Sequence, residues 1–179
     1  MPGQAWERVL DVLPKRFGRY GLRLHPEKTR LVSFRRPEGG CAAPSSRPGT
    51  FDLLGFTHYW GRSRKGDWVV KRKTARTRFS RALRQLDEWL RAHRHWPIRK
   101  QHAALNRKLR GHDAYYGITP NYRALVRLRH QVERRWRQWL STRSQHGRLS
   151  WERMQTLLRA FPLQCPRLVH SALPRAANP

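Results

Sequence analysis

The sequence predicts an α+β fold that is mainly α, in which a small β-hairpin and strand segment is followed by a helical bundle. Two observations lead to this fold class. In the middle of the chain, short apolar and aromatic runs are separated by Gly-containing, charged turns, which is typical of hairpin strands. From about residue 74 onward, apolar residues recur in steps of three and four, which is typical of amphipathic helices. We therefore expect two blocks, residues 1–73 and residues 74–179.

The first block is predicted to hold a helix, a strand and a hairpin. Pro14 should kink or restart the helix, and Gly21 should end it. TRLVSF at 29–34 is strand-like, and the Pro-, Gly- and Ser-rich residues 35–49 are typical of a loop. FDLLGFTHYW at 51–60 and DWVVK at 67–71 are predicted strands, GRSRKG between them is their turn, and Gly55 should let another backbone come close. The helix is predicted from Trp6, Val9, Leu10, Leu13 and Phe17.

The second block is predicted to be helical, with three apolar stripes and a short last helix over about 150–160. Short connections between the stripes favour a small bundle. Ser150 is the expected N-cap of the last helix, and the residues after it should lack regular structure. The stripes are Phe79, Leu83, Leu86 and Leu90; Ile98, His102, Leu105 and Leu109; and Leu125, Leu128, Val132, Trp136 and Trp139.

The charge of the chain points to a polyanionic partner. Its 179 residues include 39 Lys and Arg against 11 Asp and Glu, a formal net charge of +28. Such a charge repels itself in a compact state unless a partner neutralises it. Arg far outnumbers Lys, and its planar fork suits phosphates and bases, which favours RNA. A GC-rich genome would explain the ratio of Arg to Lys, but not the total.

Several classes of protein are disfavoured. Cys41 and Cys165 lie far apart without a CxxC motif, so neither a disulfide framework nor a thiolate zinc site is expected. HRH at 93–95 lacks supporting ligands and is more typical of a surface turn. No apolar run approaches the length of a membrane span, and no signal peptide is evident. We expect a cytoplasmic, bacterial protein without a membrane partner, with association to the nucleoid as an alternative.

Several stretches together resemble a known family. GLRLHPEKTRLVSF and FDLLGFTHYW are similar to the end of the palm domain of group II intron reverse transcriptases. LNRKLRGHDAYYGI, WRQWLSTRSQ, LSWERMQTLLRAFPL and PRLVHSALP are similar to the maturase domain of that family, also called the thumb or domain X. The resemblance implies a palm-derived segment over 1–73 and a maturase-specific thumb over 74–179. It also implies a family that copies RNA into DNA and binds its own intron RNA to assist splicing.

The resemblance and the residues together nominate nucleic-acid contacts in the first block. The hairpin resembles a segment that lies beside the primer terminus, and the rings of His58, Tyr59 and Trp60 can stack on bases. The other aromatic and apolar residues of 51–60 are as well explained by a hairpin core. Lys28 lies in HPEKT, similar to a palm motif with a Lys near the active site, where it can attend a phosphate. The alternative is a solvated Lys in a turn.

The thumb supplies the remaining candidates. In RKLRGHDAYYGI, Arg107, Lys108 and Arg110 bring charge, while Tyr115 and Tyr116 bring stacking rings or hydroxyl donors. The alternative makes both tyrosines part of the core, and we expect one to be core and one exposed. The cationic back of the third stripe completes the set with Arg123, Arg127 and Arg134.

The catalytic motif of the family is missing from the sequence. Reverse transcriptases hold Mg²⁺ with paired palm carboxylates, and this sequence has no Asp-Asp pair. We expect the chain to begin downstream of that motif, to end without an endonuclease module, to hold no cofactor and to be inactive alone. The first hypothesis is a fragment that binds intron RNA. The alternatives are part of a split polymerase, with fingers and palm on another chain and a DNA primer–template as further partners, and a degenerate basic remnant.

Overall fold

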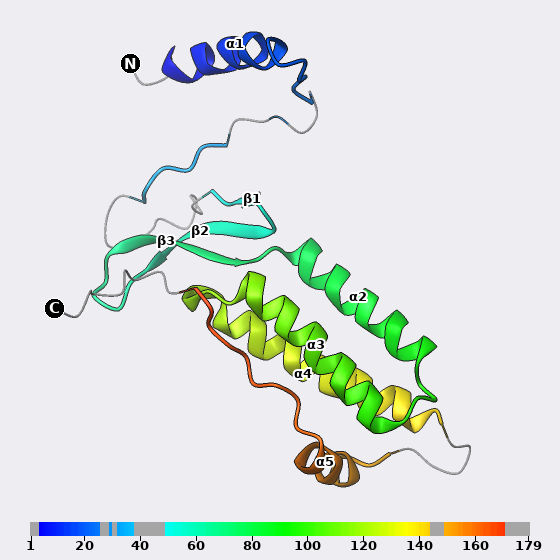
Figure 1. Ribbon diagram of the computed structural model, residues 1–179. Helices are drawn as coiled ribbons and strands as arrows, with labels where there is room; N and C mark the ends of the chain where they lie inside the picture. Colours follow the sequence, from blue (N-terminus) through cyan, green and yellow to red (C-terminus); the bar gives the residue numbers. More distant parts are fainter. Residues whose placement is uncertain (1–3, 26–28, 30–31, 38–48, 144–148, 171–179) are drawn as a thin grey trace, which may run out of the picture. The chain divides into compact units, whose positions relative to one another are not determined.

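The computed structural model describes residues 4–25, 29, 32–37, 49–143 and 149–170 (Figure 1). The chain divides into two compact units, Met1–Arg35 and Arg36–Pro179. The division falls ahead of the predicted hairpin, so the sheet and the helical bundle belong to one unit. Each unit is described by itself.

The described part of the first unit is built on one helix, α1 (Gln4–Gly18). Pro14 lies inside α1, which continues for another turn, so the predicted restart at this residue does not occur. Gly21 adopts φ +69°, and Leu22 N donates to Phe17 O at 3.0 Å, an arrangement that satisfies the last carbonyls of the helix. The prediction that Gly21 ends the helix is confirmed.

The strand predicted at 29–34 is wrong for the residues that are described. Residues 29 and 32–34 carry no strand. A strand exists only where its backbone groups pair with a neighbour, and the sheet of this chain is made by residues 51–74 alone among the described ranges.

The second unit opens with a three-stranded antiparallel sheet in the order β1-β2-β3, formed by β1 (Phe51–Leu53), β2 (Phe56–Arg62) and β3 (Trp68–Thr74). The predicted turn between β2 and β3 is confirmed, because Ser63 N donates to Asp67 O at 2.7 Å and Gly66 adopts φ +90°. The single strand predicted at 51–60 is instead a hairpin. It reverses at Leu54 and Gly55, whose φ angles of 49° and 81° suit a two-residue turn.

Helix α3 (Ile98–Tyr116) holds this unexpected turn in place. Tyr115 Oη donates to Leu54 O at 2.7 Å. A Cβ added at Gly55 would lie 2.9 Å from Tyr116 Oη. Gly55 therefore combines a positive φ with a close tyrosine hydroxyl, and a backbone also comes close, because Ala75 N donates to Gly55 O at 2.9 Å.

Among the described residues after the sheet, four helices follow: α2 (Arg76–Ala92), α3 (Ile98–Tyr116), α4 (Tyr122–Ser141) and α5 (Trp151–Ala160), with a short 3₁₀ helix, η1 (Thr119–Asn121), before α4. Figure 1 shows α2, α3 and α4 side by side, with α5 near the far end of the bundle. The α+β, mainly α fold class is confirmed. Ser150 caps α5 as predicted, accepting from Arg153 N at 3.3 Å. The buried core is made of Leu86, Leu90, Leu105, Leu109, Leu128, Val132, Trp136, Met154 and Leu163.

The predicted stripes supply most of this core, and their partly buried members Phe79, Leu83, Ile98 and Trp139 pack against it. His102 is only partly buried, and its Nε2 donates to Pro162 O at 2.8 Å. It therefore ties the bundle to the segment after α5, and does not fill the interior.

The sheet and the helices are joined through a buried asparagine. Asn121 Oδ1 accepts from Thr74 N at 2.7 Å, and its Nδ2 donates to Tyr116 O at 2.9 Å. The predicted boundary between residues 73 and 74 falls at this β3–α2 junction, inside the second unit.

Residues 161–170 run back along α3 without a helix or a ladder of strand pairs. Gln164 N donates to Asn106 Oδ1 at 2.8 Å, and Arg167 N donates to Asp113 Oδ2 at 3.0 Å. Burial raises the pKa of Asp113, although the Arg167 backbone opposes that shift. Val169 N donates to Gly117 O at 2.8 Å. The closing segment is irregular, as predicted, yet held by side chains of α3.

Candidate nucleic-acid interface

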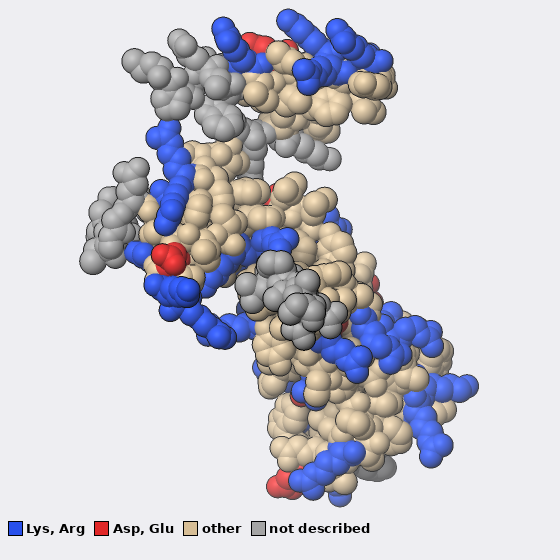
Figure 2. Space-filling model, turned by 60° about the vertical axis from the view of Figure 1, so that its left-hand side comes forward, with Lys and Arg blue, Asp and Glu red and all other residues tan. Residues whose placement is uncertain are grey.

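The surface of the protein is strongly cationic. Figure 2 shows Lys and Arg side chains in several groups on the visible face, with few Asp or Glu among them. Asp87 pairs with Arg135 at 2.9 Å and Glu133 with Arg129 at 3.1 Å. With 39 basic residues and 11 acidic ones, acids can neutralise only a minority of the cations. This surface suits a partner that carries many phosphates.

The sheet separates the three ring residues that the sequence grouped together. Successive residues of a strand point to opposite faces. His58 and Trp60 therefore share one face, with their cross-strand partners Arg72 and Val70. Tyr59 lies on the other face, where its ring is 5.1 Å from Lys73 Nζ. His58, Tyr59 and Trp60 do not form one stacking platform.

On the first face, the rings make contacts within the sheet. The His58 ring stacks on Phe51 with centroids 4.8 Å apart. At the other end of the sheet, the Arg62 guanidinium lies 4.2 Å from the centroid of the Trp68 ring. His58 is thus largely occupied by intramolecular stacking, and its contact with nucleic acid stays a prediction.

Lys28, the remaining candidate of the first block, lies outside the described residues.

On α3 the predicted cations and tyrosines have different surroundings. Arg107, Lys108 and Arg110 are all exposed. Tyr116 is partly buried, its ring lies edge-on to Phe56 at 5.2 Å, and burial raises its pKa. Tyr115 is 52% exposed, although its hydroxyl is held by Leu54 O. Both tyrosines brace the β1–β2 turn, and of the two, Tyr115 is the more exposed, although its ring stacks on Phe56 with centroids 5.8 Å apart.

On α4 the predicted cationic back is present. Arg123, Arg127 and Arg134 are exposed, whereas Leu125, Leu128, Val132 and Trp136 are buried. Arg127 and Arg134 lie four and eleven residues after Arg123, and at 3.6 residues per turn this places all three within about 40° of one another around the helix. The Arg127 guanidinium also lies 5.4 Å from the centroid of the Phe79 ring. Helix α4 thus carries one row of exposed arginines on the side opposite its buried residues.

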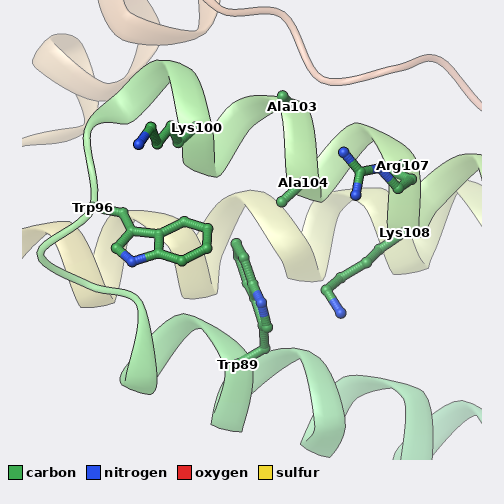
Figure 3. Close-up of a pocket in the computed structure, with 7 residues that line it drawn as sticks. All are labelled: Trp89, Trp96, Lys100, Ala103, Ala104, Arg107 and Lys108. Atoms are coloured by element: carbon green, nitrogen blue, oxygen red, sulfur yellow. The ribbon is translucent and has the colours of Figure 1, made fainter.

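A pocket between α2 and α3 was missed by the sequence reasoning. Its volume is about 440 Å³, and we call it the indole pocket. Figure 3 shows the Trp89 indole standing between Trp96 and Lys108. The sequence signal was the pair of tryptophans seven residues apart, on either side of HRH. The lining residues are Trp89, Trp96, Lys100, Ala103, Ala104, Arg107 and Lys108.

The HRH stretch lies in the segment between α2 and α3, residues 93–97, which we call the connector. His93 Nδ1 donates to Trp89 O at 2.8 Å, and the His93 ring packs against Trp89 and Trp96 at 4.7 and 4.2 Å. His95 Nε2 accepts from Arg94 Nε at 3.0 Å. These contacts explain both histidines as structural residues of the connector.

Two further properties of the described residues concern the binding of a metal ion and the crossing of a membrane. Mg²⁺ sites use clustered carboxylate oxygens, and in the described ranges no three His, Cys, Asp or Glu residues come together to hold a metal. Nor does any helix in these ranges have the length and apolarity to span a bilayer.

Comparison with protein families gives one match. Residues 79–157 match the family model of the group II intron, maturase-specific domain, which runs from α2 through α3 and α4 into α5. Neither the curated proteins nor the solved structures compared with the chain gave a match.

Proposed function

Because the chain carries a group II intron maturase-specific domain over residues 79–157, which associates it with intron splicing, we propose that this domain binds group II intron RNA directly. The role follows from the resemblance of the flanking stretches as well as from the family match. It is a binding role, and the described residues supply no metal-dependent step for it.

One observation carries the proposal: within the matched domain, the apolar and cationic faces of the helices are separated. Leu128, Val132 and Trp136 of α4 are buried, while Arg123 and Arg134 of the same helix are exposed. A helix that only completes a bundle has no need for a row of exposed arginines on its outer side. Phosphate oxygens of a folded RNA would neutralise them.

The two cationic sets have different neighbours. The α3 set, Arg107, Lys108 and Arg110, leads into the Tyr115 region and lies beside the indole pocket. The α4 set, Arg123, Arg127 and Arg134, forms a row without a comparable group of rings. We therefore assign preference for cognate intron RNA to the α3 set, and binding of phosphates in any RNA to the α4 set.

A salt titration with structured group II intron RNA tests the proposal. Counterion release lowers log K by about 0.7–0.9 per phosphate neutralised for each tenfold rise in salt. A contact with several phosphates should therefore give a steep linear slope. Binding that does not change with salt would contradict an electrostatic interface.

Charge variants locate the interface. Changing the α3 set to Gln should weaken binding and reduce the preference for cognate over random RNA, whereas changing the α4 set should weaken both RNAs alike. Thermal stability should be nearly unchanged, since exposed charges contribute little to folding. The matched control, with the same loss of charge, changes the exposed residues Arg91, Arg99 and Arg159 to Gln.

The control separates a local interface from net charge. If the control weakens binding as much as either set, the RNA responds to total charge and the assignment is wrong. If neither set matters, the RNA face lies elsewhere, and the exposed arginines of α2, Arg78, Arg81 and Arg84, are the next to test.

A further inference from the structure

The geometry points to the indole pocket as a site for an unstacked base of single-stranded RNA, with the flanking phosphates held by Lys100, Arg107 and Lys108. This inference rests on the proposed RNA-binding function. It adds a class of ligand and a residue, Trp96, that the cationic faces do not involve.

The walls of the pocket are aromatic, and its floor is formed by the small side chains of two alanines. The Trp89 and Trp96 rings are 6.1 Å apart and perpendicular. A flat ring that stacks on Trp96 therefore meets the Trp89 indole as a side wall. Ala103 and Ala104 leave the space between the two helices open (Figure 3). The volume of about 440 Å³ lies within the range of about 300–1,000 Å³ that small-ligand sites occupy.

The charge of the pocket selects an anionic ligand. Lys100, Arg107 and Lys108 line it, and no acidic residue does. Lys108 Nζ lies 5.2 Å from the centroid of the Trp89 ring, so one cation already borders the indoles. Aromatic faces beside cations are the combination with which proteins bind single-stranded nucleic acid, because the rings stack on bases and the cations hold phosphates.

The connector that presents Trp96 is fixed by its backbone. Gln101 Nε2 donates to the carbonyl oxygens of His93 at 2.6 Å and Arg94 at 3.1 Å. Arg143, at the end of α4, donates to the carbonyl oxygens of Arg94 and Trp96. The Trp96 side chain is nevertheless 42% exposed. An exposed ring on an immobilised backbone loses little conformational entropy when it stacks on a ligand.

The ligand should be single-stranded because a duplex hides the faces of its bases. In A-form RNA the bases are stacked, and the major groove is too narrow for side chains to read. A loop or bulge, in contrast, can turn a base outward onto an aromatic ring. The site therefore complements the α4 row, which needs only phosphates and accepts duplex or single strand.

Fluorescence anisotropy with a labelled single-stranded oligoadenylate tests the inference, with a blunt RNA duplex of equal length as the second probe. Base stacking contributes about 1–3 kcal/mol, which at 1.4 kcal/mol per tenfold is a change of about 5- to 150-fold. Trp96→Ala should weaken oligoadenylate binding by that factor and leave the duplex within about twofold. Trp96→Phe, which keeps a stacking ring, should restore most of the affinity.

A second variant tests the pocket without removing a ring or a charge. Ala104→Leu fills the floor and should weaken the single strand but not the duplex. Arg99→Gln, at an exposed position on α3 outside the pocket, should lower the affinity for both probes slightly and to the same extent. Circular dichroism of each variant reports whether the helices are retained.

Each outcome decides a different point. If Trp96→Ala and Ala104→Leu leave the affinity for both probes unchanged while wild type binds RNA, the pocket inference is wrong and the proposed function stands. If wild type binds neither these probes nor intron RNA, the proposed function fails as well. Trp96-dependent binding of a Glu-rich peptide, with no effect on RNA, would assign the pocket to a protein partner and overturn the inference.

Discussion

Gln101 joins α4 to the connector that carries Trp96, and we predict that Gln101→Met destabilises the protein by about 2–6 kcal/mol. Gln101 is 1% exposed and Trp136 is 0% exposed. Gln101 Oε1 accepts from Trp136 Nε1 at 2.7 Å. Its Nε2 donates to the His93 and Arg94 carbonyl oxygens. Methionine keeps the length of the side chain and removes every one of these bonds.

The magnitude follows from which partners are left unpaired. His93 O still accepts from Trp96 N at 3.0 Å, and Arg94 O still accepts from Arg143 Nε. The Trp136 indole N–H, in contrast, loses its acceptor inside the core. Burying an unpaired donor costs about 1–3 kcal/mol, and each of the other two lost bonds about 0.5–1.5 kcal/mol. The sum is a large part of the roughly 5–15 kcal/mol that stabilises an ordinary domain.

The assay is urea unfolding, followed by far-ultraviolet circular dichroism, of Gln101→Met, Trp136→Phe and the double variant. Each single variant leaves one polar partner buried without the other, whereas the double variant removes both. The double variant should therefore be more stable than the sum of the single effects predicts, by about 1–2 kcal/mol. Gln138→Met, at an exposed glutamine of α4, is the control and should change stability by less than about 0.5 kcal/mol.

Two results would refute this reasoning. Single effects that add to within about 0.3–0.5 kcal/mol would mean that the two side chains do not interact energetically. A change below about 0.5 kcal/mol for Gln101→Met itself would mean that the connector does not depend on this residue.

Two further predictions concern α3 and the turn it holds. Burial lowers the pKa of His112 to about 4 from 6.5, and both ring nitrogens lack a partner among the described residues. The unfolded chain therefore binds this proton more tightly, and stability should fall as pH drops from 6.5 toward 4, by roughly 2–3 kcal/mol at 1.36 kcal/mol per pKa unit. His112→Leu should lose less stability than wild type between pH 7 and pH 4.5 in urea unfolding, and equal losses would contradict the assignment. Gly55→Ala should lower stability by more than about 1 kcal/mol, because φ is +81° and the new Cβ would meet Tyr116 Oη. Combining Gly55→Ala with Tyr116→Phe should recover the part of the lost stability that is due to the clash. If Gly55→Ala alone melts at the same temperature as wild type, the turn is not constrained in this way.

Features that depend on local spacing could be predicted from the amino-acid sequence. Apolar residues in steps of three and four placed α2, α3 and α4 and their buried faces, because a helix brings such residues to one side whatever it packs against. Ser150 and Gly21 predicted a helix start and a helix end, since capping is satisfied within a few residues. The cationic row of α4 was visible for the same reason, as its members lie on the face opposite Leu128 and Trp136.

Features that depend on contacts between distant residues became visible only in the folded structure. Residues 51–60 were predicted as one strand, but Leu54 and Gly55 reverse the chain under the hydroxyls of Tyr115 and Tyr116, sixty residues away. The residues described within 29–34 have strand-like composition and no strand, because pairing needs a neighbour that composition does not supply. The indole pocket forms because Gln101 and Arg143 fold the connector so that Trp96 meets Trp89. Local periodicity cannot report such meetings, since the free energy that selects them comes from contacts between elements and not from the spacing of residues within one.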